Sequence, residues 1–124
     1  MMTENTDKVR KRDSARRTAL EIACGMRDGR IQLIDGCRSL VQLRADADIP
    51  PSKALDVVVA VESETDDYPV GSGRSGYAPE LLARLDAEVS KYLSDMRPVL
   101  MEACREIIRE IEALQLYSCD TKVQ

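Results

Sequence analysis

The feature that most constrains the fold is a long apolar stripe in the last third of the sequence. Apolar residues recur there every three or four positions, which is the spacing of one face of an α-helix. The stripe comprises Leu81, Leu82, Leu85, Val89, Tyr92, Leu93 and Met96, then Leu100, Cys104, Ile107, Ile108, Ile111 and Leu114. An unbroken helix over 80–116 would be about 55 Å long, much longer than a small domain is wide. Because Pro98 interrupts the stripe, the sequence predicts one kinked helix over about 79–116, or two helices divided near Met96.

Two shorter stripes in the first part of the chain predict a helical hairpin over about residues 13–44. The first consists of Ala15, Ala19, Ile22 and Met26, and the second of Leu33, Ile34, Cys37, Leu40 and Val41. Asp28 and Gly29 interrupt the pattern between them. We therefore expect a short turn at this point, with Asp28 as a candidate N-cap of the second helix.

The segment 46–52 contains two consecutive prolines, which predict a linker, and it ends in Ser52, a favourable N-cap residue. The next apolar run, LDVVVAV at 55–61, has the β-branched composition of a buried strand. A lone strand has no partner for its backbone groups, however. We expect a short helix over about 53–64, with a strand as the alternative.

Composition agrees with an all-α fold, a small helical bundle. The 124 residues suit one domain, and the chain has four Tyr but no Phe or Trp, so aliphatic side chains must form the core. We predict a flexible basic tail at 1–12, one helical domain at 13–117 and a C-terminal tail at 118–124. The tail carries Lys8, Arg10, Lys11 and Arg12, which would suit nucleic acid, although a solvated helix end is the simpler interpretation.

Several function classes are disfavoured by what the sequence lacks. There is no histidine, the commonest general base and transition-metal ligand. The cysteines at 24, 37, 104 and 119 form no C-x-x-C pair, so reduced thiols are expected and zinc is not. No apolar run reaches the roughly 18–20 residues of a membrane span. We expect a cytoplasmic protein without cofactor or bound metal, and not an enzyme.

An acidic segment after the third predicted helix is the candidate binding surface. Glu62, Glu64, Asp66 and Asp67 lie within six residues, and Tyr68 and Tyr77 follow. Residues 48–124 carry a net charge of −7, against +3 for residues 1–47. Carboxylates beside tyrosines suit an interface with a basic protein.

The same carboxylates allow a second hypothesis, a Mg²⁺ or Ca²⁺ site, because hard cations bind several oxygen ligands. Such a site would need carboxylates from another helix, and the candidates are Asp86, Glu88, Glu102 and Glu106. All-helical Mg²⁺-dependent hydrolases are built in this way. The glycine-rich segment 71–76 lacks the Lys-Ser/Thr ending of a phosphate-binding loop, so we interpret it as a flexible connector.

Three segments resemble a family of short bacterial proteins of unassigned function. They are DGCRSLVQLR at 35–44, SETDDYPVG at 63–71 and ACREII at 103–108. In that family a D/E-G-x-R-x-L-x-x-L-R helix precedes an S-E-T-D-x-x-P-x-G segment. The resemblance implies a bacterial helical protein with the second segment as its signature, and it transfers no catalytic residue. The extra Gly and Ser after Gly71 depart from the pattern.

These observations favour a non-enzymatic protein-binding module. The physical analogy is to the small acidic immunity proteins that neutralise basic toxins, so an immunity- or antitoxin-type inhibitor is the first hypothesis. A self-assembling or adaptor protein that forms a homodimer through the C-terminal stripe is the alternative. A Mg²⁺-dependent all-α hydrolase is the second alternative.

Overall fold

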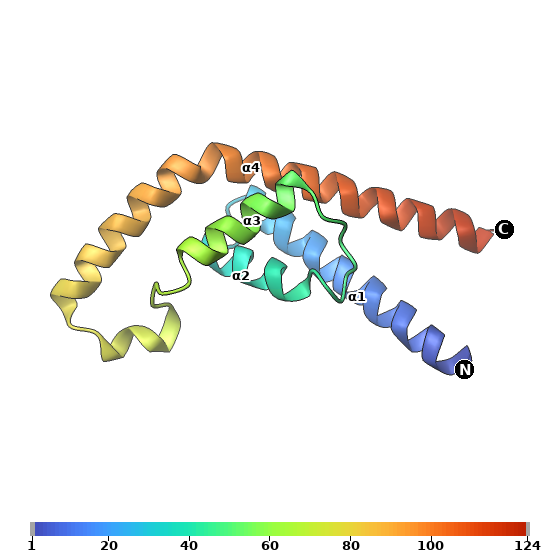
Figure 1. The fold of residues 1–124 in the computed structure, drawn as a ribbon, viewed down its shortest axis with the longest axis horizontal. Helices are drawn as coiled ribbons and strands as arrows, with labels where there is room; N and C mark the ends of the chain where they lie inside the picture. The colour runs from blue at the N-terminus through green and yellow to red at the C-terminus, as the bar shows by residue number, and fades with distance from the viewer. Residues whose placement is uncertain (1, 124) are drawn as a thin grey trace.

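The computed structural model describes the backbone of residues 2–123 and the side chains of residues 6–116. It contains four α-helices and one 3₁₀ helix (Figure 1). In chain order these are α1 (Met2–Arg27), α2 (Leu33–Leu43), α3 (Lys53–Glu64), η1 (Gly71–Gly76) and α4 (Pro79–Val123). No strand occurs among the described residues, and the prediction of an all-α fold is confirmed.

Helices α1 and α2 form the expected hairpin, and both pack on the rest of the bundle. α1 contacts α2 and α4, and α3 contacts the same two helices. In α1 the buried positions Ala15, Ala19 and Ala23 are four residues apart, so small side chains line the face that meets the core.

The turn between α1 and α2 differs from the prediction in one detail. The N-cap of α2 is Gln32, which makes no side-chain capping bond, and not Asp28. Gly29 has φ +79°, a conformation that favours glycine, and the turn places Asp28 four residues before the cap. Asp28 instead accepts hydrogen bonds from Arg27 and Arg30.

Both ends of the chain are more helical than the sequence predicted. α1 begins at Met2, so residues 2–12, expected as a tail, form its first three turns. No Gly or Pro interrupts this stretch, and Asp7 and Lys11 have the i,i+4 spacing that supports a helix. At the other end α4 continues to Val123, through most of the segment expected as the C-terminal tail.

The linker before α3 is tied down by a buried arginine. Arg16 is 5% exposed, and its Nε donates to the carbonyl oxygen of Ala47 at 2.8 Å. Burial lowers the pKa of this guanidinium. Ser52 then caps α3, accepting the backbone N–H of Leu55 at 3.1 Å, as predicted. Residues 53–64 are helical, so the strand alternative is wrong.

Helix α4 continues through Pro98, and Figure 1 shows it bent in its middle part. The predicted kink is therefore correct and the split is not. After the bend α4 supplies the buried residues Leu100, Ala103, Cys104, Ile107, Ile108 and Ile111. Before it, from 79 to 97, no residue is fully buried. The kink thus separates a core-forming half from a half that projects beside the bundle.

Among the described residues, Cys24, Cys37 and Cys104 are free, and the last two are buried. The fourth cysteine, Cys119, lies outside the described side chains. In the part of the chain that the structure describes, no helix combines the length and apolarity that crossing a membrane requires.

Candidate functional site

The predicted acidic segment forms the end of α3 and the turn that leaves it; we call residues 62–68 the acidic turn. α3 ends at Glu64, and Thr65 caps it with two bonds to the carbonyl oxygen of Val61, from its backbone N–H at 3.1 Å and its Oγ1 at 2.7 Å. Thr65 is only 2% exposed. The threonine therefore anchors the turn in the core.

Arg38 of α2 binds the backbone of the acidic turn. Its Nη2 donates to the carbonyl oxygens of Thr65 at 2.7 Å and Tyr68 at 3.0 Å, with a longer contact to that of Asp66 at 3.4 Å. One guanidinium thus binds the backbone of three residues within four positions. The shape of the acidic turn is fixed by a side chain some 30 residues earlier in the sequence.

The part of α2 that carries Arg38 is itself closely packed. Gly36, two residues before it, is buried, and a Cβ at this position would lie 2.3 Å from the sulfur of Met26. An alanine there would force the buried side chain of Met26 to move. Gly36 and Arg38 belong to one of the segments that carry the family resemblance, and residues 63–68 of the acidic turn belong to another.

The carboxylates of the acidic turn take no part in these bonds to Arg38. Glu64, Asp66 and Asp67 are exposed, and Glu62 is partly buried. Among the described residues none of the four takes part in an ion pair. Arg38 bonds to backbone carbonyls and not to carboxylates, so these side chains stay available for an outside partner.

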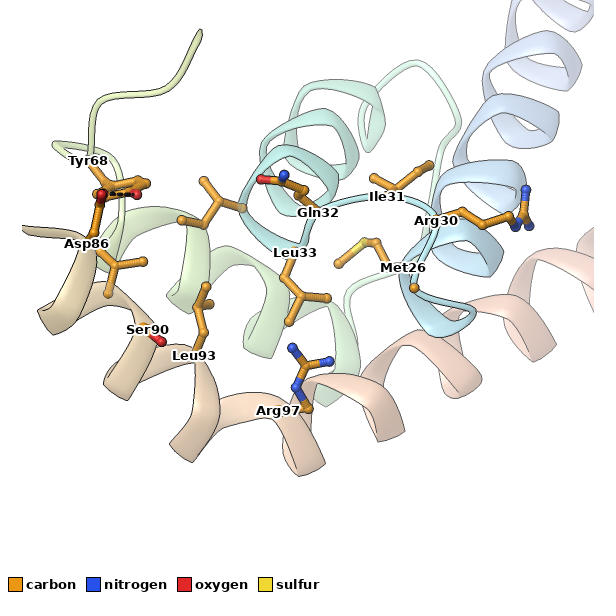
Figure 2. Close-up of a pocket in the computed structure, with 13 residues that line it drawn as sticks. Met26, Arg30, Ile31, Gln32, Leu33, Tyr68, Asp86, Ser90, Leu93 and Arg97 are labelled. Carbon is orange, nitrogen blue, oxygen red and sulfur yellow. Dashed lines mark hydrogen bonds between the residues drawn. The ribbon is translucent and has the colours of Figure 1, made fainter. Parts of the chain in front are cut away.

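Tyr68 connects the acidic turn to α4. Its hydroxyl donates to Oδ1 of Asp86 at 2.5 Å, drawn as a dashed line in Figure 2. Arg74 of η1 completes the cluster: its Nη1 and Nη2 reach the two carboxylate oxygens of Asp86 at 3.0 and 2.8 Å. Nη1 also donates to the Tyr68 hydroxyl at 3.1 Å. The hydrogen bonds from Arg74 and then Tyr68 lower the pKa of Asp86 to about 2.

This cluster changes the interpretation of two predicted elements. Tyr68 is partly buried with its hydroxyl occupied, so it fixes the position of the turn. The glycine-rich segment, expected as a flexible connector, forms η1 and is attached to α4 through Arg74. Tyr77, 41% exposed, lies beyond η1, and no hydrogen bond in the described part of the chain links its side chain to the acidic turn.

The carboxylates proposed for a metal site do not converge. Asp86 is paired with Arg74, Glu102 bonds to Arg105, and Glu106 bonds to Arg109. Within the described residues no three His, Cys, Asp or Glu side chains are grouped so that they could hold a metal ion.

Comparison with protein-family models, with curated proteins and with solved structures finds no match. The family resemblance therefore stays a prediction. Sequence reasoning missed Arg38 and Arg74 as members of the site, and it named Asp86 only as a candidate metal ligand, not as the partner of Tyr68 and Arg74. Arg38 had a signal, its place in the resembling segment; Arg74 and Asp86 had none, because their pairing depends on the fold.

Proposed function

We propose that this chain is a non-enzymatic protein-binding module of the immunity or antitoxin type, and that its acidic turn binds a basic surface of the partner. The observation that carries the proposal is the combination of a clamped backbone with unpaired carboxylates. Arg38 holds three carbonyls of the turn, while Glu64, Asp66 and Asp67 are exposed without ion partners among the described residues.

The physical reason is that binding costs less when the interface is already ordered. A turn fixed before binding loses little conformational entropy on association. Unpaired charge also attracts an oppositely charged partner over about a Debye length, roughly 8 Å at physiological salt, and so speeds the encounter. The free thiols of Cys24, Cys37 and Cys104 are typical of a reducing compartment, so we propose that the protein acts in the cytoplasm.

The experiment compares two variants with equal charge change. The test variant is E64Q/D66N/D67N, and the control is E21Q/E88Q/D95N, which neutralises three exposed carboxylates on α1 and α4. Each protein is used to capture partners from a lysate of the source cells, and captured proteins are identified by mass spectrometry. We expect a basic protein, encoded beside this chain, to be retained by the wild type and the control and lost by the test variant.

Two outcomes would refute the proposal. In one, the wild type recovers only copies of itself. In the other, the test and control variants retain the same partner equally well. Binding that does not weaken with added salt would also contradict an electrostatic interface.

Self-association is the second candidate function, and a groove at the kink of α4 favours it. The groove, about 420 Å³ in volume, is lined by apolar side chains that include Val57, Pro98 and Val99. Val99 is 49% exposed. Analytical ultracentrifugation of the wild type and V99E distinguishes this candidate: a wild-type dimer that V99E dissociates would support it, and a wild-type monomer at all concentrations would reject it.

A further inference from the structure

A pocket separate from the carboxylates of the acidic turn lies between the projecting half of α4 and the turn that joins α1 to α2 (Figure 2). Its volume is about 560 Å³. Small-molecule sites in proteins typically measure roughly 300–1,000 Å³. The kink of α4 creates this space, because it carries residues 79–97 past the bundle without burying them in it.

The middle of the pocket is apolar. Met26 from α1, Leu33 from α2 and Leu93 from α4 line it, and Ile31, Ile34 and Val89 extend the same surface. In Figure 2 Leu33 and Leu93 lie on the two sides of the space. Met26, Leu33 and Ile34 are themselves nearly buried in the core, so the partly exposed Ile31, Val89 and Leu93 supply most of the apolar surface that a small ligand would contact.

One side of this apolar surface carries a positive charge. Arg97 of α4 extends toward Leu33 in Figure 2. It takes part in no hydrogen bond or ion pair among the described residues. Arg30 also lines the pocket, but it shares Asp28 with Arg27.

The other end of the pocket is polar but not charged overall. Asp86 lines it, and its carboxylate is bonded to both nitrogens of the Arg74 guanidinium and to the Tyr68 hydroxyl. This carboxylate therefore has little capacity left for a cationic ligand. Together with Arg97, the pocket therefore has an apolar middle and a net positive charge at one end, although the whole chain has a net charge of −4.

We propose that this pocket binds a small organic carboxylate with an apolar body, such as a medium-chain or aryl carboxylate. Arg97 binds the carboxylate, and the chain or ring lies between Leu33 and Leu93. Arginine suits this role because its planar guanidinium donates two parallel hydrogen bonds to a carboxylate. Tyr68 of the acidic turn also lines the pocket, but the contacts proposed for the ligand use neither Glu64, Asp66 nor Asp67.

The experiment titrates octanoate into the uniformly ¹⁵N-labelled protein and follows backbone amide shifts by NMR. Octan-1-ol and octylammonium serve as probes with the same body and a neutral or positive head. We expect saturable shifts at Leu33, Ser90 and Leu93 with octanoate. Octan-1-ol should bind about tenfold more weakly, and octylammonium more weakly still, because each lacks the charge-assisted hydrogen bond to Arg97.

Variants test the head-group contact. R97Q should weaken octanoate about tenfold and R97K less, since lysine keeps the charge but not the paired donors. R84Q removes a charge from an exposed position of the same half-helix that does not line the pocket, and should leave octanoate binding unchanged. Circular dichroism establishes that each variant is folded.

The proposal is overturned if octanoate causes no saturable shift at millimolar concentration, or if the shifts scatter away from the pocket. It is also overturned if octan-1-ol binds as tightly as octanoate, or if R84Q weakens binding as much as R97Q. None of these outcomes bears on the acidic turn, whose test uses other residues and another readout.

Discussion

Arg38→Met removes the clamp of the acidic turn while keeping the aliphatic volume of the side chain. In the wild type the guanidinium makes two short hydrogen bonds, to the carbonyls of Thr65 at 2.7 Å and Tyr68 at 3.0 Å. The third contact, to Asp66 at 3.4 Å, is long and adds little. Methionine retains contact with the core but donates no hydrogen bond.

The expected loss follows from these two bonds. A hydrogen bond that involves a charged group contributes about 1.5–3 kcal/mol when buried, and the partial exposure of Arg38 reduces this to about 1–1.5 kcal/mol for each bond. We therefore expect R38M to lower the free energy of unfolding by about 2–3 kcal/mol. For a domain of this size that corresponds to a fall in Tm of about 8–12 °C.

Urea unfolding followed by circular dichroism measures the free energy, and calorimetry measures Tm. R38K is the comparison variant: one ammonium reaches fewer carbonyls, so it should lose about half as much. Hydrogen exchange should accelerate in residues 64–70 of R38M and not in α1. A loss below about 0.5 kcal/mol, within the range of ordinary surface substitutions, would refute the clamp. Equal losses for R38K and R38M would show that volume, not donation, matters.

Three further changes test the packing and the electrostatics of the bundle. Gly36→Ala should destabilise the fold by about 1–3 kcal/mol in urea unfolding, because its Cβ would lie 2.3 Å from a methionine sulfur; Gly73→Ala, which meets open space, should change stability by less than about 0.5 kcal/mol. Side-chain carboxyl NMR should give Asp86 a titration midpoint near pH 2, and R74Q should raise this midpoint toward 3.8. An unchanged midpoint in R74Q would show that Arg74 does not lower the pKa of Asp86. Burial raises the pKa of Cys37 from 9.0 to about 12, so the unfolded thiol loses its proton first and stability should fall as pH rises from about 9 toward 12. The urea midpoint of C37A should depend less on pH in that window, and equal dependence would contradict the assignment.

The helices were predictable because their signals are local. Ser52 and the apolar spacing of α3 lie within one segment, and Pro98 marks the bend of α4 by its own covalent geometry. The N-cap of α2 was harder to predict. Asp28 is a residue type that caps helices well, but its side chain is hydrogen-bonded to Arg27 and Arg30 instead. A sequence pattern does not reveal which of several polar partners a side chain takes.

The candidate site was predictable only in its composition. The acidic residues and Tyr68 are adjacent in the sequence, so their charge is visible there. The groups that fix them are not: Arg38 is 30 residues from Tyr68, and Asp86 is 18 residues beyond it. These pairs form only when α2, α3 and α4 pack together. Their energy therefore belongs to the tertiary fold, which local patterns do not encode.

The backbone anchor and the carboxylates of the acidic turn can be changed separately, and the kinetics of partner binding then test the proposed function. R38M keeps every carboxylate but loosens the backbone that carries them, whereas E64Q/D66N/D67N keeps the clamp and removes the charge. Long-range attraction governs association, so the neutralised variant should lower the association rate and its dependence on salt. R38M also removes one positive charge beside the carboxylates, so it should not lower the association rate, and it should raise the dissociation rate because the turn must then become ordered in the complex. Surface plasmon resonance with the purified partner separates the two rates. If R38M slowed association as much as charge removal does, the clamp would not act as proposed; if E64Q/D66N/D67N left the association rate unchanged, the carboxylates would not act by steering.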